Sequence, residues 1–480
     1  MLKKFFSDSV IYAIGPQVPK LVGLLLLPIL TRHLNAEDYA IWGIATAYMA
    51  GLHGLRDLGF TQVIVNYFFR YYYAERRWQT VWRQIFGFLI LWGIAYTLIL
   101  GVVIYFSLRH KVGNNINVVL ACTLLSAFFF DLVILFGTRL YQLKAKPLPV
   151  ALNALVSGTV SVLITYVTVV HFQLQYLSFF LALFASSLVS SILYGIPLFL
   201  RYKITPIFRF GKKMFKRHLQ VGLPTIPHIY SPYLLNASDR VILDIYKLPL
   251  NQIGQYNFAY TFGNYAELVG GAISTAFSPV FGKLYSAKTL ESDQKVRLFT
   301  FVMQSLFILG SVIVALWAKE ILNILSSNED LAAAYPFAIV IIMSYVYRPM
   351  YWVPVNKLGF EEKTHLLWRI SLVGGLVNVA LNLIFLPIFG IYTVVVSTFI
   401  GLMYIGFSGY FLKEFKKIDK LNYYPIHWLS LIIACTVATY LVRDYSTLFK
   451  VGATLFVLVI AAIAWWKNRI SISQLASTTY

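Results

Sequence analysis

The sequence from Pro19 to Phe60 reads PKLVGLLLLPILTRHLNAEDYAIWGIATAYMAGLHGLRDLGF. A short polar connection, Thr31 to Asp38, joins two apolar runs in it. Three ionisable side chains lie within the runs and not between them: Lys20, Arg56 and Asp57. A charge placed in the hydrocarbon of a bilayer costs roughly 3 kcal/mol or more, so such a residue is a candidate for function. The stretch therefore predicts two membrane helices that carry functional charges.

The composition extends this prediction to the whole chain. The 480 residues are 59% hydrophobic and 12% charged, whereas soluble domains have about 25% charged residues. Apolar runs of about twenty residues recur along nearly the whole length, as membrane-spanning helices require. The basic N-terminus lacks a small-residue cleavage site, so we expect a retained first helix and not a removed signal peptide. The sequence predicts an all-α integral membrane protein.

Hydropathy predicts about fourteen transmembrane helices. We expect them at Ser9–Leu30, Tyr39–Tyr67, Ile85–Leu108, Asn117–Thr138, Leu148–His171, Tyr176–Leu200, Leu219–Leu243, Asn251–Phe277, Val296–Trp317, Leu331–Val355, His365–Leu386, Ile391–Leu412, Tyr424–Val442 and Thr447–Trp466.

The Lys and Arg residues predict the orientation of these helices. With the N-terminus placed in the cytoplasm, 29 of the 40 fall in cytoplasmic segments, 8 in outer segments and 3 within spans. This positive-inside bias predicts that both termini are cytoplasmic, and it supports an even number of spans. Because the topology accounts for the net charge of +21, we do not expect nucleic acid as a partner.

The loops are short, and the longest basic one, RYKITPIFRFGKKMFKRH, falls between the sixth and seventh predicted spans. We expect four parts: an N-terminal six-helix lobe (1–200), this basic cytoplasmic linker (201–218), a C-terminal six-helix lobe (219–412), and a basic loop with two extra transmembrane helices (413–480). Two interpretations of the linker stay open. It is a topology determinant, or it also contacts anionic lipid headgroups, which attract such residues by about 1 kcal/mol each.

An internal repeat relates the two lobes. At an offset of 214 residues, HLNAEDYAIWGIA (33–45) aligns with KLPLNQIGQYNFA (247–259), and each segment forms the outer turn between the first two spans of its lobe. Continued without a gap, the alignment pairs His53 with Glu267. Because both lobes start from the cytoplasm, we expect a pseudo-two-fold axis along the membrane normal.

The leading helix of each lobe is rich in glycine and proline. Proline removes a backbone donor and kinks a helix, and the freed carbonyl groups need protein or water as partners. Two interpretations remain: a central, partly hydrated cavity at the repeat interface, or the ordinary frequency of proline in membrane helices. The residues concerned are Gly15, Pro16, Pro19 and Pro28 in the first lobe and Gly222, Pro224, Pro227 and Pro232 in the second.

The sequence argues against an enzyme. No Walker motif, HExxH or nucleophile elbow occurs. A polysaccharide polymerase would be expected to have a large outer loop, and a nucleotide-sugar transferase an acidic pair in a cytoplasmic loop, where only the solvated pair Glu361–Glu362 occurs. Cys122 and Cys435 lie in apolar runs without nearby histidines, so we expect neither a disulfide nor a metal site. We expect no catalytic residue and no cofactor.

The segments LTRHLNAEDYAIWGIATAY, LRDLGF, GLPTIPHIYSPYLLNASDRVIL, IGQYNFAYTFG and AFSPVFGKLY resemble the Wzx-type polysaccharide-repeat flippases. These belong to the multidrug/oligosaccharidyl-lipid/polysaccharide exporter superfamily. The resemblance covers spans one, two, seven and eight and the overall layout. It implies flipping of undecaprenyl-pyrophosphate-linked oligosaccharide repeat units across the bacterial inner membrane, for O-antigen, lipopolysaccharide or capsule, by alternating access coupled to an ion gradient. The implied partners are the lipid-linked oligosaccharide, membrane lipids and other polysaccharide-assembly proteins.

Three cations inside predicted spans are candidate ligands for the pyrophosphate. Lys20 lies near the middle of the first span, and Arg56 and Arg348 lie in the inner halves of theirs. Arginine suits phosphate because its planar fork donates two parallel hydrogen bonds. The alternatives are a structural ion pair for Lys20 and snorkelling to the cytoplasmic face for the two arginines.

Acidic and amide side chains are the candidates for ion coupling. Asp131 and Glu267 lie well inside spans four and eight, where desolvation favours reversible protonation, but each could instead pair with Lys20 or Arg348. In some superfamily members a sodium site uses carboxylates and amides of the corresponding helices. By this resemblance the weaker candidates are Asp239 and the i, i+4 pair Asn378 and Asn382. The alternative for Asp239 is an interfacial position near the outer end of its span.

Three secondary candidates complete the predicted site. Asp57 orients a neighbouring base or caps the inner end of its helix. His53 and His228 titrate near neutral pH or occupy hydrogen-bonded core positions.

Two other transporters of the superfamily stay open as alternatives. A multidrug exporter should line its site with acids and aromatic residues, which the three intramembrane cations disfavour. A peptidoglycan-precursor flippase carries the same lipid pyrophosphate, and the motifs do not exclude it.

Overall fold

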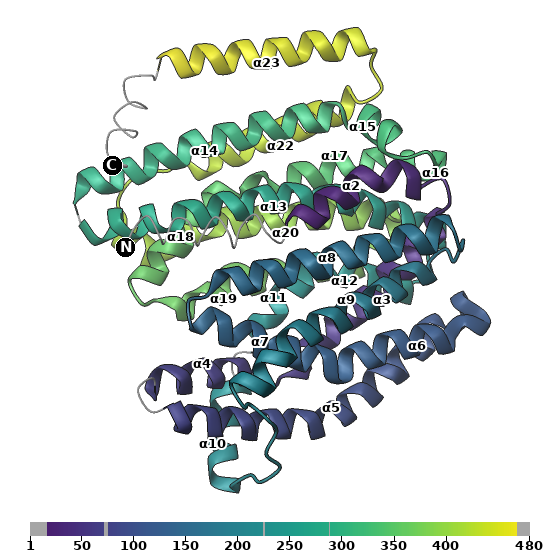
Figure 1. The fold of residues 1–480 in the computed structure, drawn as a ribbon. Coiled ribbons are helices and arrows are strands. Elements are labelled where there is room, and N and C mark those ends of the chain that lie inside the picture. The colour runs from purple at the N-terminus through teal and green to yellow at the C-terminus, as the bar shows by residue number, and fades with distance from the viewer. Residues whose placement is uncertain (1–16, 72–74, 224–225, 288, 468–480) are drawn as a thin grey trace. The chain divides into compact units, whose positions relative to one another are not determined.

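A computed structural model of the protein describes residues 17–71, 75–223, 226–287 and 289–467. Within these ranges the chain forms helices and connecting turns, and no strand occurs in them (Figure 1). The helices are α2 (Val18–Leu30), α3 (Ala36–Arg56), α4 (Phe60–Arg70), α5 (Glu75–Val112), α6 (Ile116–Leu125), α7 (Asp131–Leu143), α8 (Pro147–Val170), α9 (Leu177–Ile196), α10 (Lys212–Gly222), α11 (Ile226–Asn236), α12 (Ser238–Ile245) and α13 (Leu250–Ala287). They continue with α14 (Leu290–Leu316), α15 (Ala318–Leu325), α16 (Glu329–Ala332), α17 (Tyr335–Ser344), α18 (Arg348–Phe360), α19 (Leu367–Phe389), α20 (Tyr392–Ser408), α21 (Lys413–Ile418), α22 (Pro425–Leu441) and α23 (Thr447–Lys467).

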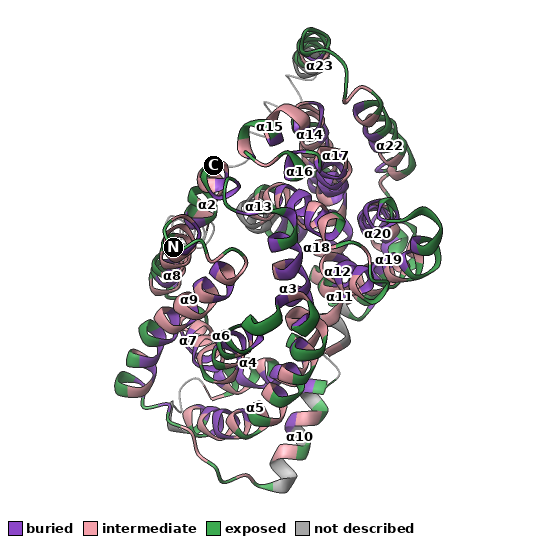
Figure 2. Cartoon of the chain, turned by 90° about the vertical axis from the view of Figure 1, so that its right-hand side faces the viewer, coloured by how far each residue is buried: buried purple, intermediate pink, exposed green. Residues whose placement is uncertain are grey.

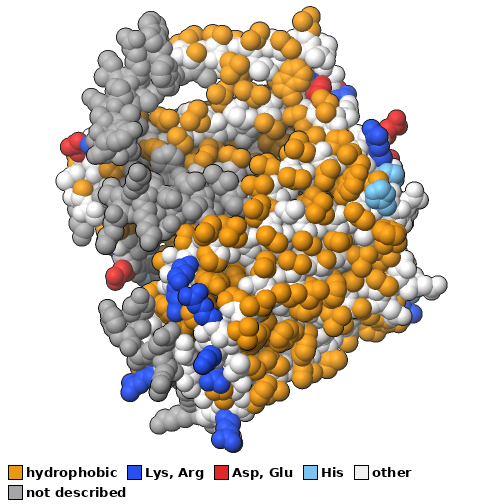
Figure 3. Space-filling model, viewed as in Figure 1, with side chains coloured by type: hydrophobic (Ala, Val, Ile, Leu, Met, Phe, Trp, Pro, Cys, Tyr) orange, Lys and Arg blue, Asp and Glu red, His pale blue; other side chains and the backbone are white. Residues whose placement is uncertain are grey.

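The described helices include seven stretches that are long and apolar enough to cross a membrane. One of them, Arg77–Leu143, is 67 residues long and contains both the third and the fourth predicted spans, which meet at a tight turn where Gly113 has a φ of +54°. Large apolar side chains are exposed on these helices, for example Leu98 and Leu200, which are 67% and 75% exposed. Hydrophobic side chains cover most of the face drawn in Figure 3, and lysines and arginines gather at one of its edges. The all-α integral membrane fold is confirmed, while the count of about fourteen spans stays a prediction.

The outer turn between the first two predicted spans is held by a capping box. The Asn35 side chain accepts a hydrogen bond from the Asp38 backbone at 2.9 Å, and Asp38 Oδ2 accepts one from the Asn35 backbone at 2.8 Å. The second Asp38 oxygen accepts a hydrogen bond from the backbone of Tyr176 at 3.0 Å. The polar residues of the connection therefore start α3 and tie it to the beginning of α9.

The second predicted span, Tyr39–Tyr67, is two helices and not one. Chain direction changes at Leu58 and Gly59, which have φ values of 49° and 73°. Asp57 stabilises the break, because its carboxylate accepts hydrogen bonds from the backbone of Gly59 and from the backbone and hydroxyl of Thr61. The hydropathy of the stretch is continuous, so only the DLG sequence marked the break, through residues that favour turns.

The chain folds as two compact units. Unit 1 comprises Met1–Tyr233 and Arg240–Gly254, and unit 2 comprises Leu234–Asp239 and Gln255–Tyr480, in their described parts. The lobe and linker boundaries expected from the sequence stay predictions.

Unit 1 has an aromatic core at one end. Trp78 and Trp82 of α5 pack against Phe68 of α4 and Phe136 of α7, and the Trp82 indole donates a hydrogen bond to the carbonyl of Ile64 at 3.1 Å. The segment that follows α9 joins this core, because Phe215 of α10 packs on Phe60 and Phe88, with ring centroids 5.4 and 4.1 Å apart. The predicted linker is thus packed on unit 1 in its described part.

Unit 2 is built around α17 and α20. The apolar windows that contain them are 67% buried, against 22% for α14. Helix α19 packs along α20, and α14 and α22 both pack against α17. Helix α23 contacts α14 and is exposed over most of its described side chains (Figure 2). The last two predicted helices therefore attach to the outside of this unit.

Candidate functional site

Arg56 forms a buried ion pair in unit 1. It is the last residue of α3, and its Nη1 lies 3.0 Å from Oδ2 of Asp131, the first residue of α7. The Arg56 side chain is 7% exposed and that of Asp131 is 37% exposed. The Nε and Nη2 atoms of Arg56 are buried and make no hydrogen bond with the described residues. The Asp131 carboxylate therefore holds the guanidinium of Arg56 in place, while the Nε and Nη2 nitrogens can still donate hydrogen bonds to a ligand.

A π-helical turn sets the position of Asp131. Residues Ser126–Phe130 form this turn between α6 and α7. An extra residue in a turn rotates everything that follows it around the helix axis, and such π-bulges often occur at functional sites. The bulge immediately precedes Asp131, so it fixes the face on which this carboxylate meets α3.

A second ion pair lies in unit 2. Arg348 Nη2, at the start of α18, lies 2.6 Å from Glu267 Oε1 on α13. The Arg348 guanidinium also lies 5.9 and 5.8 Å from the ring centres of Tyr345 and Tyr347. A Cβ atom on Gly270 would lie 2.5 Å from Arg348 Cδ. The absence of a side chain at Gly270 therefore leaves the space that Arg348 needs to reach Glu267.

The internal repeat relates the two pairs with their charges exchanged. In unit 1 the base comes from the second predicted span and the acid from the fourth. In unit 2 the acid comes from the eighth predicted span and the base from the tenth, which are the second and fourth of their lobe. The offset of 214 residues aligns Arg56 with Gly270, one helical turn from Glu267. In the predicted repeat, the Arg56–Asp131 and Arg348–Glu267 pairs therefore fall between corresponding spans.

Asp239 lies at the centre of a buried polar network in unit 2. Its carboxylate accepts hydrogen bonds from Tyr256 Oη at 2.6 Å, Asn382 Nδ2 at 2.8 Å and Thr398 Oγ1 at 2.9 Å. The Asn382 amide also donates to Asn378 Oδ1 at 2.7 Å. Asp239, Asn378, Asn382 and Thr398 are all 0% exposed. The structure therefore brings together the three residues that the sequence grouped as the weaker ion-coupling candidates.

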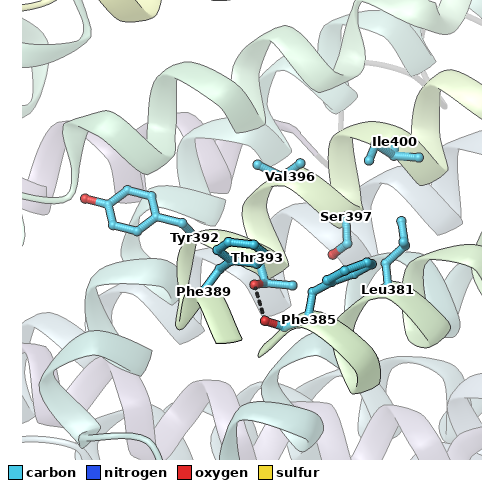
Figure 4. A pocket seen from close by; sticks show the side chains of 8 residues that line it. All are labelled: Leu381, Phe385, Phe389, Tyr392, Thr393, Val396, Ser397 and Ile400. Carbon is cyan, nitrogen blue, oxygen red and sulfur yellow. Dashed lines mark hydrogen bonds between the residues drawn. The ribbon is translucent and has the colours of Figure 1, made fainter. Parts of the chain in front are cut away.

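An apolar groove lies beside this network on α19 and α20 (Figure 4). Its volume is about 450 Å³, and Phe385, Phe389, Val396 and Ile400 are among the residues that line it. Ser397 also lines the groove, and its hydroxyl donates to Asn378 Oδ1 at 3.2 Å and contacts Asn382 Oδ1. The walls are mostly hydrocarbon, so the groove places an apolar surface beside the polar network.

The remaining predicted residues have separate positions. Lys20 is exposed on α2, which packs on α8. His53 is exposed on α3, so the structure does not give it the buried core position that was one of its two expected roles. Asp57 follows the end of α3, and its carboxylate accepts hydrogen bonds from the start of the next helix, α4, which differs from the expected cap on the inner end of its own helix. His228 belongs to α11, and its side chain lies outside the described part of the chain.

A buried lysine was not among the residues predicted from the sequence. Lys357 falls in a predicted cytoplasmic loop, but its side chain is 7% exposed, and its Nζ lies 2.7 Å from Asp293 Oδ1 and 2.8 Å from Asp419 Oδ2. Hydropathy could not find this cluster, because charges near the end of a span resemble a solvated loop. The described residues hold no group of three or more His, Cys, Asp or Glu side chains arranged for a metal ion.

Long apolar helices, exposed apolar side chains and arginine–carboxylate pairs between helices together indicate a multi-pass membrane protein. The chain belongs to the polysaccharide biosynthesis protein family, whose model matches residues 6–285. It is thereby a member of the multidrug/oligosaccharidyl-lipid/polysaccharide exporter superfamily, and the MatE family model matches residues 233–384. The resemblance found in the sequence is confirmed at this level.

Known proteins of similar sequence and fold agree with this assignment. Lsg locus putative protein 1 of Haemophilus influenzae is 25% identical over 414 residues, which cover 85% of this chain and 94% of that protein. The lipid II flippase MurJ has a similar fold, with a TM-score of 0.63 and 14% identity over 91% of this chain and 98% of MurJ. An inward-facing multidrug resistance MATE family transporter has a TM-score of 0.64 and 14% identity over 89% of this chain and 99% of its own. These two structures show the fold alone.

Proposed function

We propose that the protein flips undecaprenyl-pyrophosphate-linked oligosaccharide repeat units from the cytoplasmic to the outer leaflet of the bacterial inner membrane. The product would serve surface polysaccharides such as O-antigen, lipopolysaccharide or capsule. The family assignment supports the polysaccharide pathway, and the MurJ-like fold supports the flipping of a lipid. Both chain termini are cytoplasmic in this proposal, as the distribution of lysine and arginine indicates.

The observation that carries the proposal is the buried guanidinium of Arg56. Its Nε and Nη2 donors have no acceptor among the described residues, although the side chain is only 7% exposed. A buried donor that lacks a partner costs about 1–3 kcal/mol, and more for a charged group. A phosphate oxygen that accepted these two hydrogen bonds would remove this cost. The arrangement is therefore better matched to an anionic ligand than to the empty protein.

The carboxylate partners keep the two arginines neutralised and in position when no substrate is bound. Asp131 and Glu267 neutralise Arg56 and Arg348 and hold their guanidinium groups in place. Both carboxylates are 37% exposed, so water reaches them more readily than it reaches the arginines. A pyrophosphate would compete with them for the arginines, which makes binding reversible. Lys20 is the third cation that we assign to binding of the pyrophosphate.

The basic character also separates this function from drug export. A site for cationic drugs is expected to be lined by acids and aromatic residues, whereas here the carboxylates of Asp131 and Glu267 are each paired with an arginine. A peptidoglycan-precursor flippase would use the same cations, because its substrate carries the same lipid pyrophosphate.

We assign ion coupling to the network around Asp239. Three donors converge on this carboxylate while the network is closed. A sodium ion could enter if the hydroxyl groups of Tyr256 and Thr398 turn their hydrogens away and offer oxygen, the ligand that hard cations prefer. A proton on Asp239 would make one of its oxygens a donor, so that the donors on that oxygen would have to reorient. Either ion would change how α12, α13, α19 and α20 are joined.

The test is the leaflet distribution of undecaprenyl-pyrophosphate-linked glycan in cells depleted of this protein. We expect it to accumulate on the cytoplasmic side, and to be exported again with wild-type protein but not with Arg56→Ala. Lys295→Ala is the control, because it removes a cation from a surface i, i+4 pair with Glu291. Normal surface polysaccharide with Arg56→Ala at wild-type protein level would refute the assignment. Accumulation of the peptidoglycan precursor alone would move the function to that substrate.

A further inference from the structure

A polar pocket lies at the turn between α21 and α22, within unit 2. Its volume is about 470 Å³. Lys416, Lys420 and Asn422 contribute polar groups to its lining, and Tyr410 and Tyr423 are among its aromatic residues. The pocket is separate from the Arg56, Arg348 and Asp239 groups described above, and it combines cations, an amide and aromatic rings in one cavity.

The acidic residue of the pocket is already neutralised. Asp419 is 4% exposed. Its Oδ2 accepts hydrogen bonds from Lys357 Nζ at 2.8 Å and Tyr423 Oη at 3.0 Å, and its Oδ1 accepts one from the Leu421 backbone at 3.0 Å. Because both oxygens are occupied, Asp419 shapes the floor of the pocket and does not compete for its lysines. Lys416 and Lys420 are exposed and face a ligand as the available charges.

The walls of the pocket are fixed before any ligand binds. Tyr410 donates a hydrogen bond to the carbonyl of Met350 at 2.8 Å, and its ring lies 5.3 Å from that of Tyr423. Tyr424 has a φ of 49°, and its backbone N–H donates to Asn422 Oδ1 at 2.8 Å. This strained turn, held by the side chain of Asn422, keeps the mouth of the pocket in one shape.

The surroundings indicate a lipid and not a free anion. The pocket opens at the beginning of α22, an apolar helix on which Ile426, Leu431 and Ile433 are 62%, 45% and 44% exposed. A headgroup in the pocket could therefore leave its hydrocarbon chain against the side of α22. The segment from Lys413 to Lys420 is cytoplasmic in the topology of the proposed function, on which this step rests. Lysines just inside a membrane attract anionic headgroups.

We propose that this pocket binds the phosphate and attached polyol or sugar of an anionic lipid headgroup in the cytoplasmic leaflet. Lys416 and Lys420 neutralise the phosphate, and Asn422 with the aromatic walls contacts the hydroxyl-bearing part. The bilayer phospholipid and the polyprenyl-linked glycan share this headgroup chemistry, so both are tested.

The experiment measures lipid binding by the purified full-length protein in phosphatidylcholine nanodiscs. Phosphatidylglycerol is added in one arm and undecaprenyl-pyrophosphate-linked sugar in the other. Each lysine near an anionic headgroup contributes about fivefold to affinity, so K416Q/K420Q should weaken binding roughly thirtyfold. The control is K413Q/K417Q, which removes the same charge from the same segment, Lys413 to Lys420, outside the pocket and should change affinity less than about threefold.

A selective loss in either arm supports the pocket and identifies its ligand as the bilayer phospholipid or the glycolipid. Equal losses in the two double variants, or no loss, would overturn it, as would binding of inorganic phosphate alone with the affinity of the lipid. K420Q alone, expected to weaken binding about fivefold, checks that the result does not come from a misfolded double variant. The assay needs no transport, so a failure of flipping would not affect its reading.

Discussion

Arg56 is the residue on which charge and geometry can be separated. Lysine keeps the positive charge but lacks the planar fork that makes two parallel hydrogen bonds to phosphate. We expect Arg56→Lys to lower the rate of glycan appearance in the outer leaflet at least tenfold, the effect of losing about 1.4 kcal/mol of such bonding. Arg369→Lys, at an exposed position beside Trp368, should leave the rate unchanged. A fully active Arg56→Lys variant would mean that charge alone suffices.

Gly270 gives a second test at the residue scale, for the pair in unit 2. A methyl group there would lie 2.5 Å from Arg348 Cδ and would displace the arginine from Glu267. We expect Gly270→Ala to impair transport and to lower the stability by about 1–3 kcal/mol, as overpacking usually does. Gly271→Ala is the matched control, because among the described residues no heavy atom beyond the backbone of its own helix lies within 4 Å of the added Cβ. Thermal unfolding in detergent and surface polysaccharide output measure the two effects; equal behaviour of the two variants would contradict the contact.

The sequence could predict these charges and one of their pairings: Glu267 with Arg348 was one of its alternatives, whereas Asp131 pairs with Arg56 and not with Lys20 or Arg348. Arg56, Arg348, Asp131 and Glu267 were identifiable because each interrupts an apolar run. Their pairing depends on which helix faces touch and on the π-helical turn before Asp131, and neither is encoded in local hydropathy. The offset of 214 residues aligned Glu267 with His53, one helical turn from Arg56, but the sequence did not predict the Arg56–Asp131 pair.

At the scale of elements, the Asp239 network joins α12 and α13 to α19 and α20, and its charge should decide how they are joined. Asn in place of Asp239 keeps the shape but removes the charge that attracts a cation. We expect Asp239→Asn to lower transport more than tenfold, because a coupling ion loses its charged ligand, worth at least about 1.4 kcal/mol. The stabilisation of the wild-type protein by sodium, or its change with pH, should disappear, as measured by thermal unfolding.

Asp244→Asn is the control for this substitution. It makes the same change on the same helix, but at a carboxylate that pairs with Lys111 at 2.7 Å and accepts a hydrogen bond from Tyr48 at 3.0 Å. The ion response should therefore survive in this variant. If Asp239→Asn retained the response while Asp244→Asn lost it, the coupling site would lie at the other carboxylate of α12.

Helix boundaries show where prediction from sequence ended at this scale. The apolar run from Tyr39 to Tyr67 predicted one helix, but the carboxylate of Asp57 and the left-handed backbone of Leu58 and Gly59 favour a turn strongly enough to divide it. Polar side chains in apolar runs therefore carried more information than the mean hydropathy around them. The long apolar helices of unit 2, such as α14 and α19, needed no such correction.

At the scale of the whole molecule, ion pairs attach the last two helices, α22 and α23, to the rest of unit 2. One lies just before α22 and the other at the start of α23. Lys357 bridges Asp293 and Asp419, just before α22. Lys450 of α23 is 0% exposed and lies 2.7 Å from Glu320 of α15, and Trp317 donates to Thr454 at 3.0 Å. Between these polar contacts, α22 packs one face on unit 2, with Ile432 0% exposed, and leaves its other face exposed, as α23 does over most of its length.

The Lys357 bridge should decide whether the helix pair stays attached. Lys357→Met removes the positive charge between Asp293 and Asp419, and leaves the buried Asp419 without its cation, which costs about 3 kcal/mol or more. We expect a lower unfolding temperature and faster proteolysis of the segment between α21 and α22. Lys319→Met is the matched control: it breaks an ion pair with Asp444 whose side chains are 37% and 48% exposed, worth about 0.5 kcal/mol. Water screens an exposed ion pair but not a buried one. Similar effects of the two variants would therefore show that solvent reaches Asp419. In that case the floor of the lipid pocket would not be closed.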